Sequence, residues 1–136
     1  MRSILLVEDD FFDTMIVEKS FAKFSVQHKL HTAFNGIEAL DMLLGRNGQE
    51  TMEPLPEVIL LDLNMPKMNG HEFLEELRSQ PKLRDIPVFI TTTSAMDVDR
   101  LTAQNLGVAG YILKPIDFET STDMVDSLSL LEKLLK

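Results

Sequence analysis

The sequence contains no cysteine, so the chain can form neither a disulfide nor a thiolate metal site, and it has no cysteine nucleophile. It also lacks a long hydrophobic run. The apolar run nearest the N-terminus, Ile4–Val7, is followed at once by acidic residues. A signal peptide needs a longer apolar segment, and a membrane-spanning helix needs about 20 apolar residues. We therefore expect a cytoplasmic protein.

Positive charge is scarce as well. The chain has 13 Lys and Arg residues against 22 Asp and Glu, which gives a net charge of −9 at pH 7. Recognition of nucleic-acid phosphates or of an anionic membrane surface requires clustered Lys and Arg side chains. We therefore expect neither nucleic acid nor a membrane as a partner. A hard cation or a basic protein surface suits this chain better.

The composition is otherwise that of an ordinary globular protein. The 136 residues are 44% hydrophobic and 26% charged, and they contain no internal repeat or linker. This length predicts one domain over residues 1–136, with no separate output domain. Five apolar runs predict strands: Ile4–Val7, Lys29–Phe34, Val58–Leu61, Ile86–Ile90 and Val108–Leu113.

Segments with helical spacing separate these runs. In the first of them Phe12 and Ile16 lie four residues apart, as do Val17 and Phe21, and this spacing predicts a helix. The alternation of strands and helices predicts an α/β fold with a doubly wound parallel sheet covered on both faces. Further helices are expected around Ile37–Leu44, Phe73–Leu77, Val98–Leu101 and Phe118–Leu135.

The segment Gly45–Pro56 is longer than a minimal connection. It has twelve residues, rich in Gly, Pro and polar side chains, whereas about two to six are usual between a helix and a strand. Two interpretations stay open. The segment is either a tolerated surface insertion or an element that binds a partner or forms a homodimer.

Polar residues follow four of the five apolar runs. In a doubly wound sheet, ligands bind beyond the carboxyl ends of the strands, so these residues should meet at one edge. They are Glu8, Asp9 and Asp10 after the first run, Asp62 after the third, Thr91–Ser94 after the fourth, and Lys114 with Pro115 after the fifth.

Carboxylates gathered at one edge repel each other. At about 4 Å and an effective dielectric near 20 the repulsion is about 4 kcal/mol per pair. A bound proton or cation relieves it, and oxygen ligands favour a hard ion such as Mg²⁺. We therefore prefer a cation site formed by Glu8, Asp9 and Asp62. The plainer alternative is a run of solvated acids, with Asp10 as the N-cap of the next helix.

Together these residues fit phosphoryl transfer to a carboxylate. Asp62 is the candidate nucleophile, because a carboxylate can attack phosphorus and form an acyl phosphate. A metal ion would offset the developing charge. Lys114 would supply a second positive charge, and the Thr92 hydroxyl a hydrogen bond to a phosphoryl oxygen. Taken singly, Asp62 could be a turn former, Thr92 a strand residue and Lys114 a surface lysine.

At these residues the sequence resembles the receiver domain of bacterial two-component response regulators, in its single-domain, chemotaxis-regulator-like form. The resemblance spans essentially the whole chain. It rests on the segments ILLVEDD, VILLDLNMPKMNG, IPVFITTTSA and GYILKPI. It implies a flavodoxin-like three-layer (βα)5 sandwich with sheet order 2-1-3-4-5. It further implies a protein that is not an enzyme but assists its own phosphorylation and dephosphorylation.

The resemblance also implies roles for individual residues. Asp62 would take a phosphoryl group from a histidine kinase or a phosphotransfer protein and so switch the binding of a downstream protein target. Glu8, Asp9, Asp62 and the backbone carbonyl of Asn64 would bind Mg²⁺. Thr92 and Tyr111 match the switch positions. Lys114 matches the family's lysine, and the Lys114–Pro115 peptide bond would be cis, an isomer that only X-Pro bonds adopt readily.

Some residues depart from the usual family pattern. Glu8 replaces the usual Asp, and Thr93 stands where a smaller residue is common. Asn64 and Ser94 occupy positions that tune dephosphorylation, so the lifetime of the phosphorylated state is open. The long Gly45–Pro56 loop resembles that of small regulators serving phytochrome-type kinases, some of which dimerise.

Two other functions compete with this assignment. A haloacid-dehalogenase-type phosphatase also uses an Asp nucleophile after an apolar strand, but its general acid would have to stand at Asn64, and an amide cannot serve. A pseudo-receiver would be an interaction module without the chemistry. It should lack an acid, the acceptor or the lysine, and none is missing here.

Overall fold

The computed structural model describes residues 3–23, 29–63, 68, 70–93, 96 and 107–114. Several sequence predictions fall outside these residues. They are the helices expected around Val98–Leu101 and Phe118–Leu135, the residues Asn64 and Ser94, and the cis bond expected at Lys114–Pro115.

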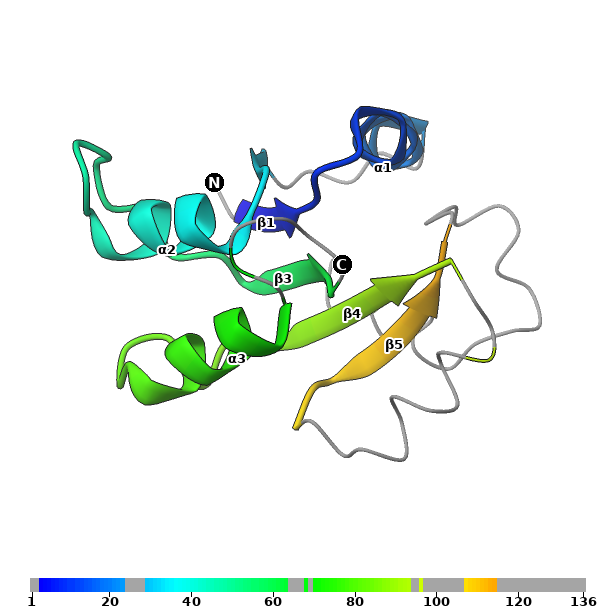
Figure 1. Cartoon of the computed structure of the whole chain (residues 1–136). Coiled ribbons are helices and arrows are strands. Elements are labelled where there is room, and N and C mark those ends of the chain that lie inside the picture. The colour runs from blue at the N-terminus through cyan, green and yellow to red at the C-terminus, as the bar shows by residue number, and fades with distance from the viewer. Residues whose placement is uncertain are drawn as a thin grey trace.

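A five-stranded parallel sheet forms the centre of the molecule (Figure 1). Its order is β2-β1-β3-β4-β5, as expected for the doubly wound arrangement. The strands are nearly continuous in apolar residues because helices cover both faces. Their bounds are Ser3–Val7 for β1, Lys29–Ala33 for β2, Val58–Asp62 for β3, Val88–Thr92 for β4 and Gly110–Leu113 for β5.

The fourth strand differs most from its prediction. The apolar run Ile86–Ile90 predicted its position, but β4 begins at Val88 and ends at Thr92. Proline has no N–H to donate, so Pro87 stands before the strand and only its carbonyl takes part, accepting from Ile59. The two threonines extend the pairing, with Thr92 opposite Leu113 of β5. Because β4 extends to Thr92, the side chain of Thr92 lies at the carboxyl edge of the sheet.

Helices lie on both faces of the sheet (Figure 1). Helix α1 (Phe11–Lys23) covers one face, where Val17 and Phe21 pack among Ile4, Leu6, Leu60 and Phe89. Helices α2 (Gly36–Leu44) and α3 (Gly70–Ser79) cover the other face. None of the described helices is long and apolar enough to cross a membrane.

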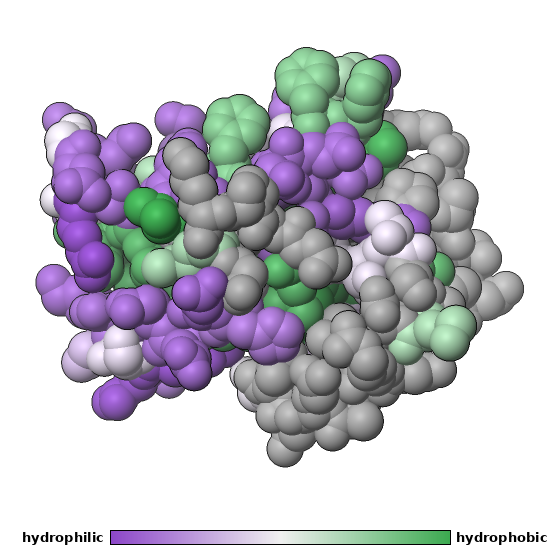
Figure 2. Space-filling model, viewed as in Figure 1, coloured by the Kyte–Doolittle hydropathy of each residue, from purple (hydrophilic) through white to green (hydrophobic). Residues whose placement is uncertain are grey.

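Only one of the two apolar pairs that predicted α1 faces the core. Val17 and Phe21 are 3% and 5% exposed, whereas Phe12 is 72% and Ile16 37% exposed. The two pairs lie on different faces of the helix, about 140° apart at 3.6 residues per turn, and only one face can contact the sheet. The other contributes to the apolar surface over α1 in Figure 2.

The segment Gly45–Pro56 packs against the amino end of the sheet. Gly45 ends α2 in the left-handed conformation, with φ of 70°. Met52 is buried, and its N–H donates to the carbonyl of Met42 at 2.9 Å. The hydroxyl of Ser3 donates to the carbonyl of Pro54 at 3.2 Å. These contacts tie the segment to α2 and β1; they do not decide whether it also binds a partner.

Candidate functional site

Three consecutive acidic residues after β1 have three different environments. Glu8 is 3% exposed, and its N–H donates to the carbonyl of Ala33 at 2.9 Å. Asp9 is exposed. Asp10 is the N-cap of α1, because its Oδ1 accepts from the N–H groups of Phe12 and Asp13 at 2.8 and 3.2 Å. The capping interpretation is therefore confirmed for Asp10 alone.

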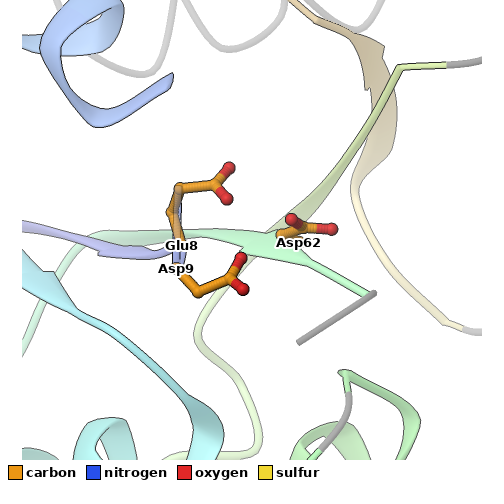
Figure 3. A group of neighbouring side chains, drawn as sticks. All are labelled: Glu8, Asp9 and Asp62. Carbon is orange, nitrogen blue, oxygen red and sulfur yellow. The ribbon is translucent and has the colours of Figure 1, made fainter. Parts of the chain in front are cut away.

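A third carboxylate lies beside those of Glu8 and Asp9, because the carboxyl ends of parallel strands meet at one edge of the sheet. Asp62 is the last residue of β3 and is 7% exposed. One carboxylate oxygen from each of these residues lies within 4.8 Å of the others. Figure 3 shows the carboxylates of Glu8 and Asp9 directed toward the side on which Asp62 lies. Carboxylate oxygens at this spacing are ligands that a hard divalent cation prefers, so the cluster is compatible with one.

Lys114 carries the positive charge of the site. Its Nζ lies 2.6 Å from Glu8 Oε1 and 3.1 Å from Asp62 Oδ2. A third carboxylate, that of Asp13 in the first turn of α1, lies 3.0 Å away. The backbone N–H of Lys114 donates to the carbonyl of Thr92 at 2.6 Å, which fixes the lysine at the end of β4.

Burial controls the charge states of this cluster. Removal of Glu8 from water raises the pKa of its carboxyl to about 7, against the opposing effect of the Lys114 ammonium. Burial alone would lower the pKa of Lys114. Hydrogen bonds to Glu8 and Asp13 and the charge of Asp62 overcome that effect and raise the pKa above its ordinary value. The lysine is therefore charged at neutral pH, and Glu8 is close to its titration point.

The two residues matched to switch positions lie on neighbouring strands, as the sequence predicted. Thr92 is buried at the end of β4. Tyr111 on β5 pairs with Ile90, two positions before the partner of Thr92. Alternate residues of a strand point to the same face, and Tyr111 packs with Ile90 on the face that α2 and α3 cover.

A glycine lets α3 start directly beside the end of β3. The N–H of Gly70 donates to the carbonyl of Leu63 at 3.0 Å. A Cβ at Gly70 would lie 2.6 Å from Leu63 Cα, far inside van der Waals contact with backbone. The residue must therefore be small for the chain to pass so close to Asp62. Gly70 is the last residue of the segment VILLDLNMPKMNG, and this close approach explains why a glycine stands there.

Four of the predicted site residues thus come together: Glu8, Asp9, Asp62 and Lys114. The sequence prediction missed Asp13. The signal for it was weak, because an acid in the first turn of a helix is common for its interaction with the helix dipole alone. Its contact with Lys114 depends on how α1 leaves the edge of the sheet.

Comparison with known proteins identifies the family. A family model described as the response regulator receiver domain matches residues 4–126. The chain belongs to this family. Receiver domains of response regulators act in phosphorelay signal transduction, and their partners are histidine kinases or phosphotransfer proteins. This membership favours the receiver over the phosphatase that the sequence analysis kept as an alternative.

Several relatives support the assignment over most of their length. Response regulator Rcp1 of Synechocystis sp. is 34% identical over 127 residues, which are 93% of this chain and 86% of Rcp1. A two-component response regulator from Legionella pneumophila is 40% identical, with a TM-score of 0.79 over 98% of both chains. The bacteriophytochrome response regulator RtBRR is 36% identical, with a TM-score of 0.80 over 94% of this receiver and 78% of RtBRR. The sequence analysis predicted a likeness to small regulators that serve phytochrome-type kinases, and a bacteriophytochrome response regulator is among these relatives.

Proposed function

We propose that Asp62 accepts the phosphoryl group in this receiver. The observation that carries the proposal is the contact between the Asp62 carboxylate and the buried Lys114 ammonium, 3.1 Å apart at the carboxyl edge of the sheet. This places the candidate nucleophile next to a fixed positive charge where negative charge would develop. Among the acids of the described site, Asp62 alone ends the third strand, where the family motif stands.

The residues present fit Mg²⁺. We propose that Glu8, Asp9 and Asp62 hold it, since their oxygens lie within 4.8 Å of one another. The backbone carbonyl of Asn64 is proposed as a further ligand from the family motif alone. The relative Rcp1 has been solved in a Mn²⁺-bound form, which supports the binding of a divalent cation by this receiver. When bound, Mg²⁺ would supply charge that offsets the charge on the phosphoryl oxygens.

The transfer step is a displacement at phosphorus. An oxygen of Asp62 forms a bond to the phosphorus of a partner's phosphohistidine, the N–P bond breaks, and the electron pair returns to the imidazole of the partner. Lys114 donates to a phosphoryl oxygen, and the Thr92 hydroxyl donates to another. The donor comes from the partner, so the chain supplies position and electrostatics and is itself the substrate rather than a turnover enzyme.

The signal then passes by protein contact. The acyl phosphate places new negative charge beside Thr92, and a shift of this hydroxyl toward it would leave space for Tyr111 on the neighbouring strand. A local charge change would thereby alter the surface around β5, which a downstream protein target reads. Thr92→Ala should still accept phosphate but lose phosphorylation-dependent binding.

The experiment uses acetyl phosphate as donor. With Mg²⁺ present, the wild-type chain should gain the mass of one phosphoryl group. Asp62→Asn should gain none, whereas the control Asp85→Asn, an exposed acid before β4, should behave like the wild type. No mass gain in the wild type would reject the proposal and favour a pseudo-receiver. Continuous release of phosphate from p-nitrophenyl phosphate would instead revive the phosphatase.

A further inference from the structure

Lys114 has a partner that the proposed reaction does not use. Asp13 Oδ2 lies 3.0 Å from Lys114 Nζ. Within the part of the chain that the structure describes, the carboxylates close enough to share a cation are those of Glu8, Asp9 and Asp62, without Asp13. The Asp13 carboxylate is thus placed to act on the lysine rather than on the cation site.

Backbone hydrogen bonds hold both sides of this contact. On α1, the N–H groups of Phe12 and Asp13 donate to the capping carboxylate of Asp10 at 2.8 and 3.2 Å. After β5, the N–H of Lys114 donates to the carbonyl of Thr92 at 2.6 Å. The lysine side chain is only 9% exposed. The fold therefore sets this contact, unlike a chance meeting of two mobile surface side chains.

The contact also occupies the last hydrogen of the ammonium group. Each N–H of an ammonium serves one acceptor, and Glu8, Asp13 and Asp62 together take all of them at 2.6, 3.0 and 3.1 Å. A phosphoryl oxygen can gain a donor from Lys114 only if one carboxylate releases it.

Asp13 is the carboxylate that can release the lysine most easily. Its side chain is 26% exposed, against 3% for Glu8 and 11% for Asp62. Water can therefore replace the ammonium at Asp13, whereas breaking the pair at a buried carboxylate leaves an uncompensated charge. Glu8 and Asp62 are in addition the residues that would hold the metal ion.

We propose that Asp13 is a positioning residue that competes with the incoming phosphoryl group for Lys114 and so slows phosphorylation of Asp62. This inference rests on the proposed function. Removing the Asp13 charge should weaken the hold of this side chain on the lysine, so that a phosphoryl oxygen gains the donor more easily. It should also reduce the repulsion of an anionic donor. A purely structural role for Asp13 predicts the opposite sign, since loosening Lys114 would slow the reaction.

The test measures the rate of phosphoryl uptake from acetyl phosphate by the full chain with saturating Mg²⁺. Asp13→Asn should raise the rate on the order of three- to tenfold, the effect of one charge at short range in a solvated setting. Asp13→Glu, which keeps the carboxylate, should bring the rate back toward the wild type. Glu18→Gln is the matched control, because it removes one charge from an exposed position of the same helix. It should leave the rate unchanged.

Two results would overturn the inference. One is a rate for folded Asp13→Asn at or below that of the wild type. The other is an equal acceleration by Glu18→Gln, which would make the effect one of net charge. If either occurs while Asp62→Asn alone abolishes uptake, the proposed function stands and the role of Asp13 is rejected. If the wild type takes up no phosphoryl group, the proposed function is rejected, and this inference with it.

Discussion

The two ends of the sheet differ in the kind of side chain that they enclose. At the carboxyl end charged side chains are buried or half-buried, and Lys114 is surrounded by the carboxylates of Glu8, Asp13 and Asp62. At the amino end the connecting segments close over apolar side chains such as Leu43, with ordinary backbone hydrogen bonds and a cavity of about 380 Å³.

This difference places the residues that stabilise the fold and the residues of the candidate site at opposite ends of the sheet. Burying charges costs free energy unless they are paired, and even paired charges stabilise a protein little. Apolar burial at the opposite end contributes about 25 cal/mol for each Å² removed from water. We therefore expect substitutions at the amino end to change the free energy of unfolding, and substitutions at the carboxyl end to change chemistry.

The largest expected effect is on stability, and it should appear at one end only. Leu43 is 1% exposed at the amino end, so Leu43→Ala should lower the free energy of unfolding by roughly 2–5 kcal/mol. Asp62→Asn should instead leave it within about 1 kcal/mol of the wild type without metal, because the carboxylate repulsion that is relieved offsets the attraction to Lys114 that is lost. Urea unfolding measures both. A large loss of stability in Asp62→Asn would contradict the claim that the carboxyl end contributes little to the free energy of unfolding.

Phosphorylation should depend on the lysine at one end and not on a lysine at the other. Lys114→Ala should slow uptake from acetyl phosphate by about 100-fold, as loss of one donor to a developing oxyanion does. The matched control is Lys82→Ala, an exposed lysine beside the cavity at the amino end, which should keep the wild-type rate. Equal rates for both variants would show that Lys114 does not assist phosphoryl transfer.

Metal affinity offers a third contrast between the ends. Asp9→Ala should weaken Mg²⁺ binding by roughly 30-fold or more, because it removes a proposed ligand and loss of a residue that only hydrogen-bonds to a ligand already costs about 10- to 100-fold. Asp85→Ala, at the amino end, should leave it unchanged. Isothermal titration calorimetry measures the affinity directly. Unchanged affinity in Asp9→Ala would reject the proposed cation site.

The smallest expected effect is a pH dependence of that affinity. Burial raises the pKa of Glu8 to about 7, so below that pH the carboxyl holds a proton that Mg²⁺ must displace. Affinity should therefore rise by about tenfold between about pH 6 and about pH 8, with proton release on binding at the lower pH. Glu8→Gln should abolish this rise. A flat profile in the wild type would show that Glu8 is already ionised in the metal-free site.

The same comparison explains what could be predicted from the sequence. Unbroken apolar runs marked the strands, because helices cover both faces of a parallel sheet. The boundary of β4 was misplaced because Thr91 and Thr92 are polar residues that nevertheless pair with β5. The buried face of α1 was ambiguous, because two apolar stripes have the same spacing and only the sheet decides between them.

The site was predictable where the fold rule was simple. Carboxyl ends of parallel strands share one edge, so Glu8, Asp9, Asp62 and Lys114 could be placed together from their order alone. Asp13 could not, because its contact with Lys114 depends on the angle at which α1 leaves that edge. The close approach at Gly70 was also invisible in the sequence, since it depends on where the backbone of Leu63 passes.

The most direct test of the account is to locate the phosphoryl group. After reaction with acetyl phosphate and Mg²⁺, borohydride reduction of the acyl phosphate and peptide mass spectrometry identify the modified side chain. The account predicts modification at Asp62, with none at Glu8, Asp9 or Asp13. A phosphoryl group on any of those other carboxylates would contradict the account, as would an unmodified Asp62 in a chain that binds Mg²⁺.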